Sequence, residues 1–91
     1  MKVKVRSMAS FRYILGKERD VDLSNGSTVG SLLNILCAAH GELQALLFEG
    51  SELKEDVNIL VSGKNIESLK GMKTELSDGD EVVLFPAAIG G

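Results

Sequence analysis

The residues whose types and spacing most clearly suggest a chemical role are the last seven: Phe85, Pro86, Ala87, Ala88, Ile89, Gly90 and Gly91. The two glycines carry no Cβ, so this segment can enter a slot that is too narrow for other residues. Pro86 has no N–H to donate, and we expect it to end the last strand at Phe85 and to begin a mobile arm. Six fully extended residues reach at most about 20 Å. We interpret the rest of the chain as a domain that holds and presents the α-carboxylate of Gly91.

The side chains elsewhere offer little for catalysis. A single cysteine, Cys37, cannot form an internal disulfide or a multi-thiolate metal site. It falls near an apolar helical stripe, where a small buried hydrophobe is favoured over a thiol that relays sulfur. His40 is interpreted as a favourable contact at the end of that helix rather than as a ligand. We predict no metal site, no phosphate-binding glycine loop and no pair of nucleophile and base.

Length and composition restrict the class of protein. The 91 residues are enough for one domain with one modest core. A net charge of −3 argues against nucleic acid as the main partner, because phosphate binding requires clustered Lys and Arg. The sequence has no apolar run long enough to cross a bilayer and no leader pattern, so we expect a cytoplasmic protein.

Hydrophobic periodicity predicts the elements that must position the tail. Residues 2–6, 19–23 and 57–61 alternate as half-buried strands do. Residues 28–40 change to a helical period, with Ser27 or Thr28 as the N-cap and Gly41 as a left-handed end. Residues 42–56 give no clear assignment. These elements predict an α+β fold with a mixed sheet of four to five strands on one main helix. The domain spans residues 1–85 and the tail residues 86–91.

The last strand, residues 81–85, is apolar on both faces, although one main helix can cover only one of them. Val83 and Phe85 share the second face, and Leu60 raises the same question on its own strand. Two interpretations compete. The loop at residues 67–77 folds over these three side chains, or they form an exposed patch that a partner covers. The pattern alone leaves both open, and the adjacent tail favours the partner.

Several segments in the last third of the sequence resemble one known family. They are VNILVSGKNI at 57–66, LKGMKTEL at 69–76, DGDEV at 78–82, Phe85-Pro86 and Gly90-Gly91. With one central helix, they resemble the ubiquitin-like β-grasp sulfur carriers of the MoaD-like family, which includes the small subunit of molybdopterin synthase. The chain departs from that family at Ala87, where a second proline is frequent, and at Ser62, where asparagine is frequent.

The resemblance implies a carrier without an active site or bound cofactor of its own. An adenylating enzyme of the ubiquitin-activating type would use ATP to join the Gly91 carboxylate to AMP. Sulfur would then replace AMP, and the thiocarboxylate would enter the large subunit of molybdopterin synthase. Pro86 to Gly90 would insert into these partners, and Leu60, Val83 and Phe85 would dock against them.

Three alternatives stay open at this stage. The chain could be a ubiquitin-like modifier that joins Gly91 to lysines of target proteins. It could serve another pathway, such as thiazole synthesis, although carriers of that kind are usually shorter. In the last alternative, the domain is a binding module in which the Gly-Gly pair is incidental.

Overall fold

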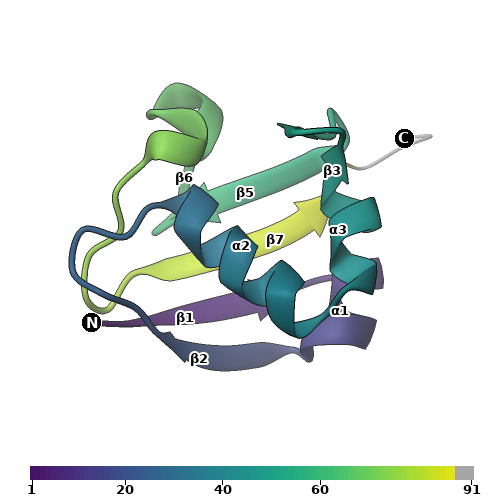
Figure 1. The fold of residues 1–91 in the computed structure, drawn as a ribbon. Coiled ribbons are helices and arrows are strands. Elements are labelled where there is room, and N and C mark those ends of the chain that lie inside the picture. Colours follow the sequence, from purple (N-terminus) through teal and green to yellow (C-terminus); the bar gives the residue numbers. More distant parts are fainter. Residues whose placement is uncertain (88–91) are drawn as a thin grey trace.

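Within residues 1–87, which the structure describes, five strands form one mixed sheet whose inner face is covered by a helix (Figure 1). The structure is a computed structural model. Its elements are β1 (Lys2–Ser7), α1 (Ser10–Leu15), β2 (Glu18–Asp22), α2 (Val29–Ala39), α3 (Glu42–Leu47), β3 (Phe48–Glu49), β4 (Glu52–Leu53), β5 (Val57–Val61), β6 (Lys64–Asn65), the 3₁₀ turns η1 (Ile66–Ser68) and η2 (Gly71–Lys73), and β7 (Glu81–Pro86). The predicted α+β, β-grasp architecture is confirmed.

The strand order is β2-β1-β7-β5-β6. β1 pairs antiparallel with β2 and parallel with β7, which therefore lies in the middle of the sheet. β5 pairs antiparallel with β7 and with the short β6. The alternation predicted for the first strand is also correct, because Val3 and Val5 are buried while Lys2 and Lys4 are exposed.

Helix α2 forms where the helical period predicts it. Thr28 is its N-cap: the Thr28 side chain accepts from the backbone N–H of Ser31, and the Ser31 hydroxyl accepts in return from the N–H of Thr28. The buried side of α2 consists of the predicted stripe Val29, Leu32, Leu33 and Leu36. The expectation for Gly41 is wrong, since it is right-handed (φ −57°, ψ −35°) and leads directly into α3.

Residues 42–56, for which no clear assignment was predicted, fold into α3 and a two-stranded hairpin. Leu43 and Leu47 are fully buried, one helical turn apart on the same side of α3. In the hairpin, Phe48 pairs with Leu53 and Glu49 with Glu52. Each of these elements is too short to show a reliable period, so packing rather than propensity determines them.

Residues 66–76 turn toward the helix side of the sheet. Ile66 and Leu76 are buried in the core that α2 covers, and Met72 packs against it. The backbone oxygen of Met72 lies 3.2 Å from where a Cβ on Gly30 would stand, so a side chain at Gly30 would crowd this contact. Among residues 1–87 there is no helix with the length and apolar character needed to span a membrane.

Candidate functional site

The root of the C-terminal tail is held more firmly than Pro86 alone predicts. The ladder does not stop at Phe85: Pro86 is the last residue of β7 and pairs with Val57 of β5. The backbone N–H of Ala87 then donates to the carbonyl of Asp56. Proline lacks a donor, but at the last position of a strand this costs little. Pro86 and Ala87 therefore belong to the folded domain, and the other tail positions, Ala88, Ile89, Gly90 and Gly91, lie outside the described residues.

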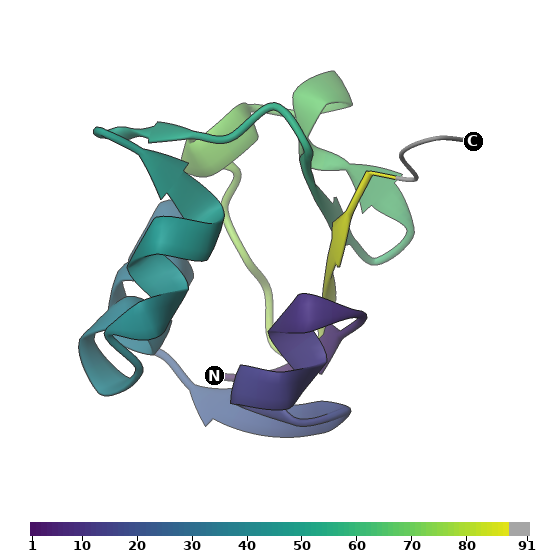
Figure 2. The same ribbon diagram turned by 90° about the vertical axis from the view of Figure 1, so that its right-hand side faces the viewer.

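The three predicted docking residues lie together on the outer face of the sheet, opposite α2. Leu60 and Val83 are partners in the register of β5 and β7, and Phe85 follows Val83 on the same face. In Figure 2 the blue and teal helices α2 and α3 lie on one side of the domain and yellow β7 on the other. The loop at residues 67–77 does not cover them, because its 3₁₀ turns lie toward α2.

Exposure differs among these three side chains. Val83 is only 9 % exposed, whereas Leu60 and Phe85 are half-buried. Val83 lies between Leu60 on β5 and Arg6 on β1 in the register, and the alkyl stem of an arginine can cover apolar surface. We call Leu60, Val83 and Phe85 the outer-face patch. It is an apolar area next to the last residues of β7.

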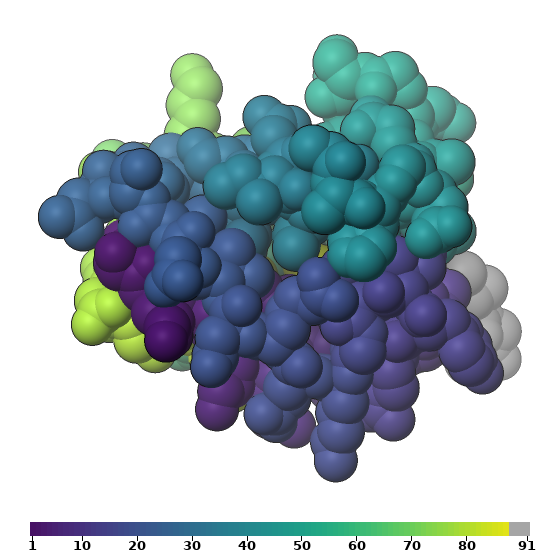
Figure 3. Space-filling view, turned by 60° about the horizontal axis from the view of Figure 1, so that its bottom comes forward, coloured from purple at the N-terminus to yellow at the C-terminus, as the bar shows by residue number. Residues whose placement is uncertain are grey.

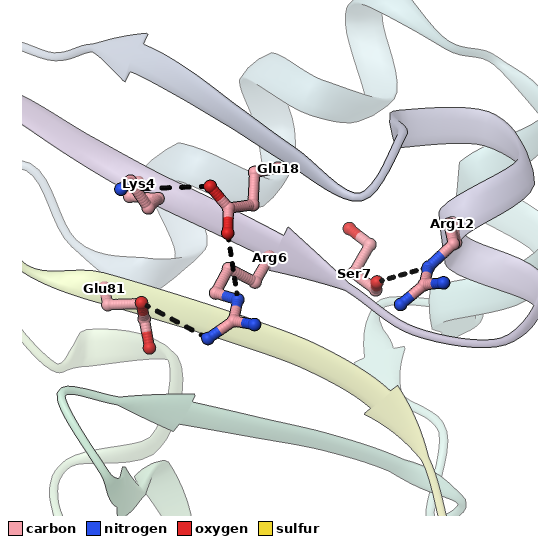
Figure 4. A network of polar contacts seen from close by, with 6 residues as sticks. All are labelled: Lys4, Arg6, Ser7, Arg12, Glu18 and Glu81. Atoms are coloured by element: carbon pink, nitrogen blue, oxygen red, sulfur yellow. Dashed lines mark hydrogen bonds and ion pairs between the residues drawn. The ribbon is translucent and has the colours of Figure 1, made fainter.

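Figure 4 shows a network of charged side chains on β1, β2 and β7, and its Arg6 is the register partner of Val83 in the outer-face patch. Arg6 lies 3.5 Å from a carboxylate oxygen of Glu18 and 3.8 Å from one of Glu81. Lys4 reaches the other oxygen of Glu18 at 3.8 Å. All four side chains are between 38 % and 49 % exposed, so each pair contributes less than about 1 kcal/mol to stability. The network is therefore better understood as a polar rim around an apolar centre than as a source of stability.

Met8 belongs beside the outer-face patch and was missed by the sequence interpretation. Its side chain is 42 % exposed, and its backbone N–H donates to the carbonyl of Leu84 at 3.1 Å. The alternation that directs Lys2, Lys4 and Arg6 outward continues to Met8. This signal is present in the sequence, but the predicted strand ends at residue 6.

The other polar candidates do not converge on a site. Cys37 is half-buried on α2, and partial burial raises the pKa of its thiol. His40 caps α2 through its backbone, and its Nε2 lies 3.0 Å from a guanidinium nitrogen of Arg19. An arginine only donates, so Nε2 of His40 accepts this bond. Within the described part of the chain, no three potential metal ligands gather closely enough to hold an ion.

Comparison with known proteins identifies the family of this chain. Residues 5–91 match the model of the ThiS family, which covers almost the whole chain. The chain belongs to the ThiS family. It is similar to small archaeal modifier protein 3 of Haloferax volcanii, with 37% identity over 92 residues and full coverage of both chains. It is also similar to the sulfur carrier protein CysO of Mycobacterium tuberculosis, with 31% identity over 94 residues and full coverage of both.

A solved structure shows the same fold. The Pyrococcus furiosus protein with the provisional name molybdopterin converting factor subunit 1 superimposes with a TM-score of 0.80 and 32% identity. The match covers 97% of this chain and 99% of that one. The fold is thus the ubiquitin-like β-grasp, and the chain is a ubiquitin-like protein of the sulfur-carrier and small-modifier kind.

Proposed function

We propose that this protein is a sulfur carrier whose reactive group is the carboxylate of Gly91. One observation carries the proposal: β7 delivers the tail root, Pro86 and Ala87, to the border of the outer-face patch. A partner that covers the patch would therefore also receive the tail. Membership of the ThiS family and the Gly90-Gly91 pair support the same role.

The chemistry begins with a poor electrophile. A carboxylate oxygen of Gly91 attacks the α-phosphorus of ATP in the partner's active site, and pyrophosphate leaves. The resulting acyl-adenylate has AMP as its leaving group, so a hydrosulfide equivalent can attack the carbonyl carbon and release AMP. The product is a thiocarboxylate on Gly91. In this proposal the catalytic side chains belong to the adenylating enzyme. The β-grasp domain docks on that enzyme and delivers the Gly91 carboxylate, and it binds no cofactor of its own.

For the pathway, we propose molybdopterin synthesis, with the large subunit of molybdopterin synthase as the acceptor of sulfur. The segments at residues 57–66, 69–76 and 78–82 support this assignment through their resemblance to the small subunit of that enzyme. The Pyrococcus furiosus protein, whose provisional name refers to the same pathway, is similar over nearly the whole chain.

A second candidate is a protein modifier that joins Gly91 to lysines of target proteins. The observation in its favour is the 37% identity to a protein named as a small archaeal modifier. Both functions share the adenylate and differ only in the nucleophile, which is sulfur in one case and a lysine amine in the other.

Trapping the adenylate tests what the two functions have in common. The protein is incubated with ATP, Mg²⁺ and the adenylating enzyme of the same organism, without any sulfur source. We expect its intact mass to rise by one adenylyl group, and a chain lacking Gly91 to stay unchanged. If the chain lacking Gly91 gained an adenylyl group as well, the adenylated group would not be the Gly91 carboxylate. Conjugates in cells that disappear when Gly91 is deleted would favour the modifier.

A further inference from the structure

The length of the tail limits the distance between the domain and the active site of a partner that binds Gly91. Ala87 is fixed to Asp56, so only four residues lead from it to Gly91. Four extended residues span at most about 14 Å. The inference here rests on the proposed function, which places the reacting carbonyl at Gly91. An enzyme that encloses this carbonyl must therefore press against the surface around the tail root.

Two flanks of opposite charge border the tail root. On one side, Glu49, Glu52, Glu55 and Asp56 line a hollow of about 440 Å³ together with Leu53 and Lys54. On the other side, residues 8–17 carry Arg12 and Lys17 and no acidic residue. Helix α1 packs against β1 and β7, which places this basic segment next to the end of β7 (Figure 1).

The basic flank presents an aromatic side chain that the fold does not use. Phe11 and Leu15 anchor α1 and are each 2 % exposed, whereas Tyr13 is 92 % exposed. Arg12 is also exposed, and its Nε donates to the carbonyl of Ser7 at 3.4 Å (Figure 4). This bond holds the guanidinium beside the turn between β1 and α1. In the space-filling view the indigo residues of the α1 segment form part of the visible surface, not hidden by α2 or α3 (Figure 3). We call Arg12, Tyr13 and Lys17 the α1 ridge.

We propose that the α1 ridge is a second docking surface for the adenylating enzyme. The matching surface of that enzyme holds an apolar pocket for the Tyr13 ring and carboxylates that face Arg12 and Lys17. Tyrosine and arginine are the side chains that most often dominate binding energy at interfaces. Because the acidic flank lies on the other side of the root, complementary charges on the enzyme fix the direction from which the tail enters.

The test measures ATP–pyrophosphate exchange at increasing carrier concentration, with the full chain and its adenylating enzyme. Tyr13→Ala is expected to raise the KM for the carrier about ten-fold, as loss of an interface aromatic does, while kcat stays near the wild-type value. Lys17→Glu is expected to raise KM at low salt and less at high salt, because salt screens surface charges.

Two matched variants control for changes of surface that have nothing to do with the tail root. Ile35 is 47 % exposed on α2, and Lys73 is exposed in η2. Ile35→Ser and Lys73→Glu are therefore expected to leave KM unchanged. Thermal unfolding of Tyr13→Ala should match the wild type, because this side chain has almost no contact with the core.

The outcomes separate this inference from the proposed function. If the wild-type chain supports no exchange, the proposed function is wrong and the inference falls with it. If Tyr13→Ala and Lys17→Glu are both activated with wild-type KM, the inference alone is wrong. The inference is also wrong if the variants have wild-type KM in the exchange reaction but do not transfer sulfur to the acceptor. The α1 ridge would then be a docking surface for the acceptor.

Discussion

Ala9 is the residue at which the backbone departs most clearly from what its type favours. It has φ 53° and ψ −130°, and the N–H of Phe11 donates to the carbonyl of Met8 at 3.2 Å around it. This is the first central position of a type II′ turn, which glycine normally occupies. The strained turn leads from β1 into α1, and alanine gives no sequence signal for it.

The strain at Ala9 predicts that Ala9→Gly stabilises the protein. Relief of an unfavourable backbone conformation contributes about 1–3 kcal/mol, and the greater freedom of glycine in the unfolded chain offsets part of this. We expect a net rise of about 1 kcal/mol in the free energy of unfolding, measured with urea. Gly16→Ala is the control at the other end of α1: with φ 82° and ψ 176°, it should destabilise. A lower stability of Ala9→Gly would show that the turn is not strained.

Cys37 is predicted to take no part in sulfur transfer. Partial burial raises the pKa of its thiol, so the reactive thiolate is scarcer at neutral pH than for an ordinary cysteine. Cys37→Ala should therefore form the thiocarboxylate at the wild-type rate, as followed by intact mass. A slower rate would make Cys37 a relay.

The same thiol predicts a small dependence of stability on pH. A folded-state pKa above the unfolded value gives stability that is complete below the unfolded pKa and is lost as pH rises through the folded pKa. The free energy of unfolding should thus fall in the alkaline range above about pH 8.5, where free thiols ionise. Cys37→Ala should remove this part of the decline, and an equal decline in both proteins would assign it to other groups.

At the scale of elements, the two faces of β7 have different surroundings. Leu84 is fully buried under α2, while its neighbour Phe85 is half-buried on the outer face. We propose that this apolar outer face, which no helix of the described residues covers, is a binding surface. The same strand carries the core and presents the tail root.

The two faces of β7 predict opposite effects for neighbouring substitutions. Phe85→Asp should keep a cooperative unfolding transition, with a loss of about 1 kcal/mol, and weaken binding of the adenylating enzyme at least about ten-fold by calorimetry. Leu84→Ala should lower the free energy of unfolding by about 2–5 kcal/mol, because it opens a cavity in the core. If Phe85→Asp unfolds the domain, Phe85 is a core residue and the outer-face patch is not a docking surface.

The elements that the sequence predicts well are those long enough to show a period. Alternation located β1, β2 and β5, a run that is apolar on both faces located β7, and the apolar stripe located α2 within one residue at each end. Alternation also predicted that Leu60, Val83 and Phe85 share one face. It could not decide what covers them, since this depends on where residues 66–76 pack in three dimensions.

The elements that the sequence predicts poorly depend on tertiary contacts. α3 and the β3–β4 hairpin are short and are stabilised by packing, so residues 42–56 gave no assignment. Pro86 predicted the end of the ladder one residue too early, because a proline can still pair at the last position of a strand. Anchoring of Ala87 depends on Asp56, which lies 31 positions earlier in the sequence (87 − 56) and gives no local signal.

At the scale of the whole molecule, the proposed function makes the domain a docking body with one chemical group to deliver. The inner face of the sheet makes the core, the outer face carries the outer-face patch, and the tail root at Pro86 and Ala87 lies beside the acidic hollow that Asp56 lines. Among the described residues, Lys4, Arg6, Glu18 and Glu81 form a polar rim beside the patch. The proposed division of labour leaves catalysis to the partners.

The most direct test of this account is the intact mass of the protein after reaction with ATP, its adenylating enzyme and a hydrosulfide source. We expect one oxygen to be exchanged for one sulfur, fragmentation to place the sulfur on Gly91, and a chain lacking Gly91 to stay unmodified. An unchanged mass in the presence of an enzyme that is active on another carrier would contradict it, as would sulfur found on any other residue.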